Sequence, residues 1–359
     1  QSGFVEGVRA AKGEDNVILV DAGDNFSGGG APFYYNFVDT TSAHLYPRLA
    51  AYMGYDAVVA GHSDFEAGHR VYDRVAREMR KAGVPFLAGN AVSERTGKGY
   101  LPAYSIIKKG GVKVAVLGYT NAANASLMDA SCVSDLRFDS LLPLVQEDVD
   151  KVRSKEKPQV VIVVAHTSMG KGDGLNLEKQ GLDLFNSLKG VDVLVTGHDH
   201  STKVLKTDST VLLDCGRAGQ YACLADIKLV VRGGKVISRS LSGEVESFGS
   251  ENYDTAMEEA FKSDYEKVRD FNASHVGEVK KDLVSREFYY RQCDYMNFLH
   301  ALAFSAWPVD ISLSATLLID GMVPAGEVRY QDIRKIYPYD NKPVSYTHLR
   351  AHETPEHLV

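Results

Sequence analysis

Five short apolar runs in the first two hundred residues end in turns that carry Asp, Gly or His, and this pattern restricts the fold more than any other feature. The runs occupy residues 17–20, 56–60, 112–117, 160–165 and 191–195. Largely apolar runs of this length are typical of strands buried on both faces of a sheet. Between the second and third runs, apolar residues recur at helical spacing and predict an amphipathic helix over 69–82. Strands that alternate with helices predict an α/β protein.

The pattern changes after residue 205. Apolar segments at 211–213, 223–231 and 236–237 predict an antiparallel layer, and Gly233-Gly234 predicts the turn of a hairpin. Residues 251–271 predict a long helix with one apolar face. This helix is a candidate connector to a second unit.

We therefore expect several parts along the chain, namely a first unit over 1–250, a helical linker over 251–282, a smaller unit over 283–342 and a tail over 343–359. The tail has no apolar periodicity and resembles translated sequencing-adaptor sequence. The chain opens on Gln1 with no basic or apolar leader segment after it, so we expect a cut end there.

Charge and cysteine content exclude several classes of protein. The 359 residues include 40 Lys and Arg against 47 Asp and Glu, for a net charge of −7. This balance argues against a protein that binds nucleic acid through its own basic surface, so handling phosphates would require metal ions or local cations. The four cysteines form no C-x-x-C pair, which argues against a disulfide scaffold or a cysteine zinc site. The longest apolar run is too short to span a bilayer.

Side chains able to bind metal follow the carboxyl ends of four predicted strands. They are Asp24, His62, His166, His198 and His200. A single Asp after a strand is usually a turn or cap, and a single His is usually an ordinary surface or core residue. The Gly197-His198-Asp199-His200 element is more specific, because two His flank one residue directly after a buried strand. Ligands bind at the carboxyl ends of strands in open α/β sheets, and a carboxylate with several imidazoles suits zinc, manganese or iron.

Four motifs in order resemble the calcineurin-like metallophosphoesterases, and most closely the branch of 5′-nucleotidases and 2′,3′-cyclic phosphodiesterases. The motifs are Asp21-Ala22-Gly23-Asp24-Asn25-Phe26-Ser27-Gly28, Ala60-Gly61-His62-Ser63-Asp64-Phe65-Glu66, Ala165-His166 and Gly197-His198-Asp199-His200. The resemblance implies a four-layer α/β/β/α sandwich over 1–250. It also implies a partial C-terminal α/β nucleotidase domain over 283–342.

The resemblance implies a site for two divalent metal ions (zinc, manganese or iron). Asp24 stands at the bridging position, His200 at a ligand position of the first ion, and His166 and His198 at those of the second. His62 stands where the family has an Asn ligand. The implied reaction is attack on phosphorus by a metal-activated water. The implied partner is a small phosphate ester or a nucleotide and not a nucleic-acid polymer. An extracytoplasmic location, periplasmic or at the cell surface, rests on the resemblance alone.

Departures from the family pattern bear on activity. The strand that carries D-x-H in the family would precede Gln1, which leaves Asp24 and His200 for the first ion. Ser63 stands where the family has a catalytic His, although the acidic partner is kept as Glu66. Ser cannot act as a general acid near neutral pH, and the single ring of His62 cannot serve as both ligand and acid.

The predicted C-terminal unit also departs from the family pattern. Asp320 stands where the family has a phosphate-binding Arg, and Tyr339 matches a position that stacks on the base. A second stacking segment would lie beyond 341. We therefore keep two alternatives to an active hydrolase, which are a catalytically weakened protein that binds metal and nucleotide, and a surface scaffold without metals. The joint presence of Asp24, His166, His198 and His200 argues against the scaffold.

Overall fold

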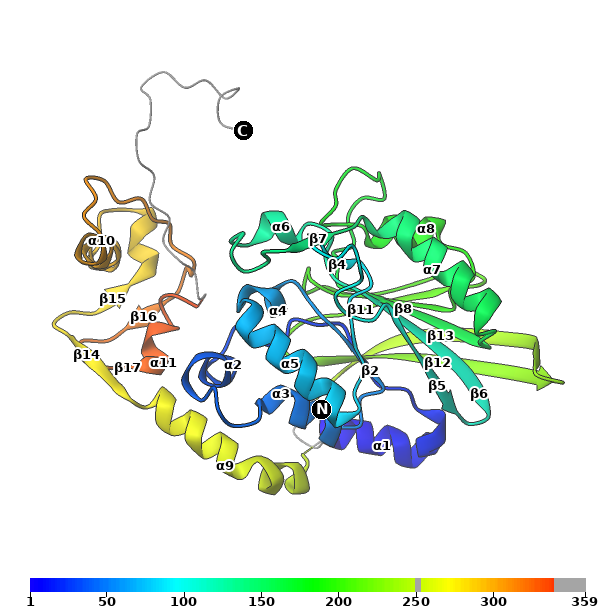
Figure 1. Ribbon diagram of the computed structural model, residues 1–359. Coiled ribbons are helices and arrows are strands. Elements are labelled where there is room, and N and C mark those ends of the chain that lie inside the picture. The colour runs from blue at the N-terminus through cyan, green and yellow to red at the C-terminus, as the bar shows by residue number, and fades with distance from the viewer. Residues whose placement is uncertain (249–252, 339–359) are drawn as a thin grey trace, which may run out of the picture. The chain divides into compact units, whose positions relative to one another are not determined.

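The computed structural model describes residues 1–248 and 253–338 (Figure 1). The chain forms two compact units. The first contains residues 1–27 and 35–262, and the second contains residues 28–34 and those from 263 onward. Tyr339 and the tail over 343–359 lie outside the described residues.

A six-stranded sheet forms the centre of the first unit. Its strand order is β10-β11-β9-β8-β6-β5. Four strands run parallel, namely β6 (Val112–Tyr119), β8 (Val160–Ala165), β9 (Val193–Thr196) and β11 (Val211–Cys215). The antiparallel strands β5 (Tyr104–Lys109) and β10 (Thr202–Lys206) lie at its edges. All six residues of β8 are buried, so its apolar run reflects burial on both faces of the sheet.

A second, three-stranded parallel sheet contains β1 (Val20–Asp21), β2 (Ala57–Val59) and β3 (Phe86–Leu87). The first strand is shorter than the predicted run over 17–20. The carbonyl of Val17 accepts a hydrogen bond from the Lys109 ammonium, and the amide of Leu19 donates to the Asp56 carboxylate. These backbone groups therefore bond to side chains instead of to a neighbouring strand.

Alternate residues of both sheets face different cores, which produces the predicted four layers. On β2, Val58 packs outward against helix α5 (His69–Ala82), whereas Ala57 and Val59 pack toward the other sheet. On β8, Val161 and Val163 pack outward against α7 (Leu141–Lys155) and α8 (Gly181–Ser187). The order helix, sheet, sheet, helix is the α/β/β/α sandwich expected from the sequence. Helix α5 has the predicted bounds and ends at Gly83, whose φ of 75° is a left-handed cap.

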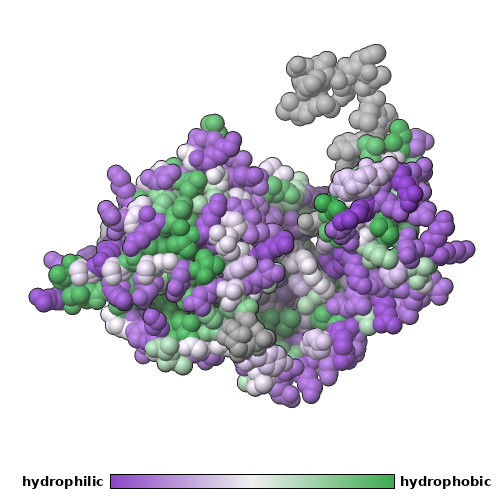
Figure 2. Space-filling model, turned by 180° about the vertical axis from the view of Figure 1, so that it is seen from behind, coloured by the Kyte–Doolittle hydropathy of each residue, from purple (hydrophilic) through white to green (hydrophobic). Residues whose placement is uncertain are grey.

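Two segments of the predicted antiparallel layer form a hairpin of β12 (Tyr221–Arg232) and β13 (Lys235–Ser247), with the predicted turn at Gly233-Gly234 (Figure 1). The prediction was wrong for 211–213, which belong to β11 and pair in parallel with β9 in the central sheet. Leu241 of this hairpin packs into the core between the two sheets. Figure 2 shows hydrophobic side chains around the protruding end of the hairpin, where Val230, Val231 and Ile237 are exposed.

Shorter elements complete the first unit, and the last of them begins one residue before it, at Tyr34. They are α1 (Ser2–Lys12), α3 (Leu45–Tyr52), α4 (Ser63–Glu66), α6 (Asn124–Leu127), the strand pair β4 (Ala91–Ser93) and β7 (Leu136–Phe138), a 3-10 turn (Glu14–Asn16) and a π-helical turn (Tyr34–Val38). No helix within 1–248 and 253–338 is long and apolar enough to cross a membrane.

The second unit is smaller. Helix α9 (Thr255–Asn272) leads into it along the chain. Its remaining elements are α2 (Gly30–Phe33), the pair β14 (His275–Val279) and β17 (Gly326–Arg329), the pair β15 (Leu283–Val284) and β16 (Met322–Val323), a 3-10 turn (Ser285–Tyr289), α10 (Asp294–Ala306) and α11 (Tyr330–Ile333). Its core is small and is built around Leu283, Tyr295, Met296 and Val323.

Candidate metal centre

Four loops at the carboxyl ends of parallel strands deliver one polar side chain each to the same point. Asp24 follows β1 and His62 follows β2, so these two come from the three-stranded sheet. His166 follows β8 and His198 follows β9, so these two come from the six-stranded sheet. One donor atom from each side chain lies within 4.8 Å of the donor atoms of the other three. Four of the five ligand-type residues singled out in the sequence therefore meet.

The distances within this cluster match those between ligands of one ion. Asp24 Oδ2 lies 3.0 Å from His62 Nδ1 and 3.2 Å from His166 Nε2. His62 Nδ1 lies 3.1 Å from His166 Nε2 and 3.1 Å from His198 Nδ1. Zn–N distances of about 2.0–2.1 Å in a tetrahedral site place neighbouring donors about 3.3 Å apart. One carboxylate and three imidazoles are ligands for zinc, manganese or iron, so the donor set fits a divalent cation.

Two hydrogen bonds orient the imidazole rings. His166 Nδ1 lies 2.7 Å from the carbonyl oxygen of Ala22, and His198 Nε2 lies 3.1 Å from Glu178 Oε1. Each outer nitrogen donates its hydrogen to these oxygens, which leaves the other nitrogen of the ring free to bind a cation. Sequence reasoning missed Glu178, because it belongs to an irregular segment with no local pattern that marks a role.

The loops hold strained backbone at the centre. Six non-glycine residues of the described chain have positive φ, and three of them belong to this region: Asp24 (66°), His198 (87°) and His200 (59°). Such conformations cost free energy and persist where the surrounding contacts enforce them. Their concentration here indicates that side-chain placement outweighs local backbone preference.

Asp64 connects the two loops of the three-stranded sheet. Its buried carboxylate accepts hydrogen bonds from the amides of Gly61 and Asn25 at 2.7 Å, and from those of Asp24 and Phe26 at 3.0 Å. Burial and the nearby charge of Asp24 raise the pKa of Asp64 to about 6. This residue lies within the 60–66 motif, but its role as an acceptor for four amides depends on loop conformation and is not evident from the sequence.

The charged groups of the cluster shift one another's pKa values. Burial alone would raise the pKa of the Asp24 carboxyl, but His166 and His62 beside it hold that pKa well below its usual range. Burial likewise opposes protonation of His166, yet the adjacent Asp24 raises the pKa of that imidazole. Burial and the two neighbouring imidazoles lower the pKa of His198. The carboxylate is therefore ionised near neutral pH, and a neutral His198 favours metal binding.

The other predicted site residues have different positions. His200 is exposed and lies outside the four-residue cluster, although it lines the same pocket. Ser63 is buried at the start of α4, and its backbone amide donates to Asp24 Oδ1 at 2.9 Å. Glu66 is exposed at the end of α4.

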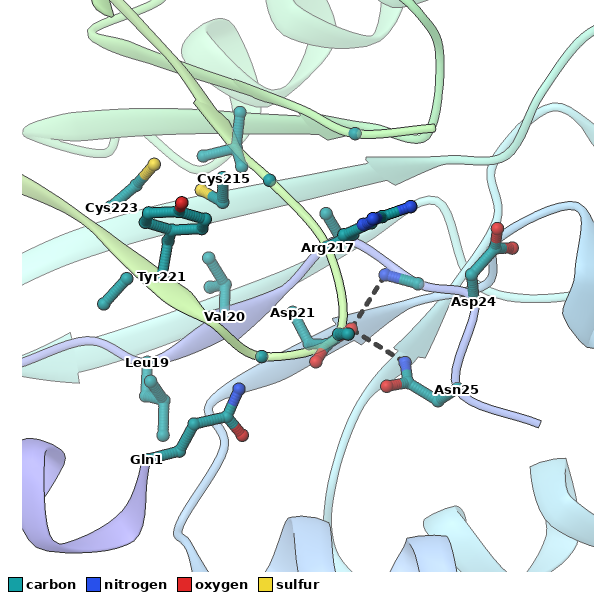
Figure 3. A pocket seen from close by; sticks show the side chains of 18 of the residues that line it. Gln1, Leu19, Val20, Asp21, Asp24, Asn25, Cys215, Arg217, Tyr221 and Cys223 are labelled. Carbon is teal, nitrogen blue, oxygen red and sulfur yellow. Dashed lines mark hydrogen bonds between the residues drawn. The ribbon is translucent and has the colours of Figure 1, made fainter. Parts of the chain in front are cut away.

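The pocket beside the cluster has a volume of about 600 Å³ (Figure 3). The β1 end with Asp21 and Asp24 forms part of its wall, together with the imidazoles of His166, His198 and His200. The turn between β11 and β12, which includes Arg217, forms a further part of the wall. The pocket provides room for a ligand next to the candidate metal position.

Comparison with known proteins agrees with this geometry. The model of the calcineurin-like phosphoesterase family matches residues 4–202. The 5′-nucleotidase of Rattus norvegicus is 27% identical over 203 residues, which cover 55% of this chain and 32% of that protein. The 5′-nucleotidase of Vibrio cholerae is 21% identical over 348 residues, which cover 85% of this chain and 62% of that protein. The chain thus spans less than two thirds of these relatives.

Solved structures share the fold. A candidate 5′-nucleotidase from Staphylococcus aureus superposes with a TM-score of 0.79 at 16% identity, covering 94% of this chain and 66% of that one. The calcineurin-like phosphoesterase YfkN from Bacillus subtilis superposes with a TM-score of 0.64 at 18% identity, covering 75% of this chain and 89% of that one. The fold and the strand-end cluster define a layered α/β protein with a candidate metal centre at the carboxyl ends of strands from both sheets. The chain belongs to the calcineurin-like phosphoesterase family.

Proposed function

We propose that this chain is the hydrolytic part of a metal-dependent phosphoesterase that acts on small phosphate esters, with nucleotides as the preferred class. The observation that carries the proposal is the convergence of Asp24, His62, His166 and His198 within 4.8 Å. The names of the relatives support a nucleotide substrate. An acidic chain needs cations to bind phosphate, and this cluster supplies the ligands for them.

Asp24, His62, His166 and His198 would hold the ions, with His200 as a further ligand at the pocket wall. Divalent ions bound there supply positive charge for the phosphate and lower the pKa of a coordinated water. Asp24 directs Oδ2 toward the imidazoles, while the Ser63 amide holds Oδ1. Glu178 and the Ala22 carbonyl keep the two outer rings in the required orientation.

A second candidate function, a catalytically weakened protein that binds metal and nucleotide, is supported by the position of His62. Nδ1 of His62 faces the other donors of the cluster, so this imidazole serves as a ligand and not as the acid for the leaving group. The neighbouring Ser63 hydroxyl cannot replace it near neutral pH. General acid catalysis typically contributes about 10²–10⁴-fold in rate, so slow turnover follows if no other group protonates the leaving group.

Metal analysis and turnover test the proposal together. We expect the manganese- or zinc-loaded protein to hydrolyse p-nitrophenyl phosphate and nucleoside monophosphates. His198→Ala should lose bound metal by elemental analysis and lose activity, whereas His275→Ala, an exposed histidine on β14, should change neither. Unchanged metal content in His198→Ala would reject its ligand role. A metal-loaded chain without turnover on a broad panel of phosphate esters would reject the hydrolase.

Ser63→His separates the two candidate functions. If the natural chain is weakened by the absence of an acid, this substitution should raise the rate at least tenfold at constant metal content. An unchanged or lower rate would reject the weakened-enzyme candidate.

Our proposal of an extracytoplasmic location rests on family resemblance, and fractionation of the cells that produce the full protein would test it.

A further inference from the structure

The turn between β11 and β12 runs beside the histidine-rich loop after β9. Strands β10 and β11 pair in a register that places Thr202 opposite Cys215. One residue further out, the amide of Gly216 donates to the carbonyl of Ser201 at 2.7 Å. His200 directly precedes Ser201, and Arg217 directly follows Gly216. These two residues therefore lie next to each other at the end of the sheet.

Arg217 carries an uncompensated positive charge at this place. Its side chain is exposed, and within the described residues no hydrogen bond or ion pair to its guanidinium is found. Figure 3 shows the Arg217 side chain extending across the pocket toward Asp24. The nearby carboxylates have other partners, since Asp24 pairs with His62 and His166, and Asp21 accepts from Gly23 and Asn25.

Among the described residues that line the pocket, Arg217 is the only Lys or Arg, and the remaining lining is apolar, acidic, neutral polar or histidine. In the C-terminal unit, the position at which the family resemblance predicts a phosphate-binding arginine holds Asp320, which pairs with Arg286. A phosphate monoester that enters the pocket would therefore meet one guanidinium of this chain beside the loop that carries His198 and His200.

We infer that Arg217 binds the phosphoryl group of the substrate, as a phosphate monoester, and orients it toward the candidate metal centre. A guanidinium forms paired, charge-assisted hydrogen bonds to two oxygens of a phosphate, which a lysine ammonium cannot reproduce. The inference rests on the proposed phosphoesterase function, and it assigns to the β11–β12 turn the anion contact that Asp320 cannot make.

Calorimetric titration with inorganic phosphate tests this assignment without depending on turnover. We expect Arg217→Ala in the manganese-loaded chain to bind phosphate at least tenfold more weakly than the natural protein, and Arg217→Lys to bind with intermediate affinity. Manganese content by elemental analysis should be the same in all three proteins. The matched control is Arg232→Ala, which removes the same charge from an exposed position on β12 outside the pocket, and it should leave phosphate affinity unchanged.

The outcomes distinguish this inference from the proposed function. Equal phosphate affinity in Arg217→Ala and the natural protein, with p-nitrophenyl phosphate still hydrolysed, would overturn the role of Arg217 and leave the phosphoesterase intact. A natural protein that binds manganese but neither binds phosphate nor hydrolyses the ester would overturn both. If Arg232→Ala lost as much phosphate affinity as Arg217→Ala, the loss would be explained by the change in net charge. That outcome would reject a specific contact between Arg217 and phosphate.

Discussion

At the scale of single residues, the candidate site depends on groups whose surroundings override their ordinary behaviour. Asp24 and His198 adopt positive φ, and Asp64 uses its carboxylate for four backbone amides instead of for solvent. The four residues that cluster could be singled out from the sequence, because Asp and His after buried strands are chemically conspicuous. Glu178 could not, because its contact with His198 joins two irregular segments whose conformations depend on the rest of the fold.

The buried imidazole of His44 makes the stability of the protein depend on pH. Its ring is buried, is held by Asn36 Oδ1 at 3.0 Å, and accepts a hydrogen bond from the Tyr46 amide. Burial and the nearby Arg74 lower the pKa of His44 to about 4. The unfolded chain, with an ordinary histidine pKa near 6.5, therefore binds more protons between these values, and stability falls as pH decreases from about 6.5 toward 4.

We expect this single group to account for about 2 kcal/mol of lost unfolding free energy between pH 7 and pH 5. Urea unfolding of the natural protein and of His44→Gln at both pH values measures it. The glutamine variant should be less sensitive to pH by about that amount. Equal pH sensitivity of the two proteins would show that His44 is not held neutral in the fold.

At the scale of elements, the predicted apolar runs differ in how much of each run forms a strand. The runs at 112–117 and 160–165 form long strands, because their apolar residues pack on one face or the other of a covered sheet. The run at 17–20 contributes only its last residue to the ladder, and before it the Val17 carbonyl and the Leu19 amide bond to the side chains of Lys109 and Asp56. Hydrophobicity predicts burial, but it does not predict which polar partner a backbone group will find.

Two glycines in different elements predict opposite effects of the same substitution. A Cβ at Gly61 would overlap Asp24, since the β1 and β2 loops touch there. A Cβ at Gly7, within α1, would meet nothing within 4 Å. We expect Gly61→Ala to lower the melting temperature and the metal content, because the Asp24 loop must move.

Gly7→Ala should stabilise the protein by about 0.5–1 kcal/mol, since alanine is the better helix former. Thermal unfolding and elemental analysis of both variants provide the measurement. Normal metal content and melting temperature in Gly61→Ala would contradict the close approach of the two loops.

At the scale of the whole first unit, one buried carboxylate ties three layers together. Asp192 is 1% exposed and pairs with Arg153 of α7 at 2.7 Å and with Arg239 of β13. It also accepts a hydrogen bond from the amide of Val161 in β8 at 2.8 Å. The helix layer, the central sheet and the hairpin therefore each contribute a hydrogen-bond donor to one buried carboxylate.

We expect Asp192→Asn to lower the unfolding free energy by about 1–3 kcal/mol, because two partly exposed arginines lose a charged, hydrogen-bonded partner. Asp208→Asn, at an exposed turn, is the matched control and should change stability by less than about 0.5 kcal/mol. Chemical denaturation at neutral pH compares the two. A small effect in Asp192→Asn would mean that solvent or other acceptors replace the carboxylate.

The sequence by itself determined the alternation of strands and helices and the kinds of side chain placed after each strand, because burial period and residue chemistry are local properties of the chain. The four layers were implied only by the family resemblance of its motifs. The tertiary structure alone decided that Asp24, His62, His166 and His198 share one point while His200 lies apart, and that Glu178, Asp64 and Arg217 surround them. Those distances join residues far apart in the chain, and they depend on strand register and on strained loop conformations that no local pattern encodes.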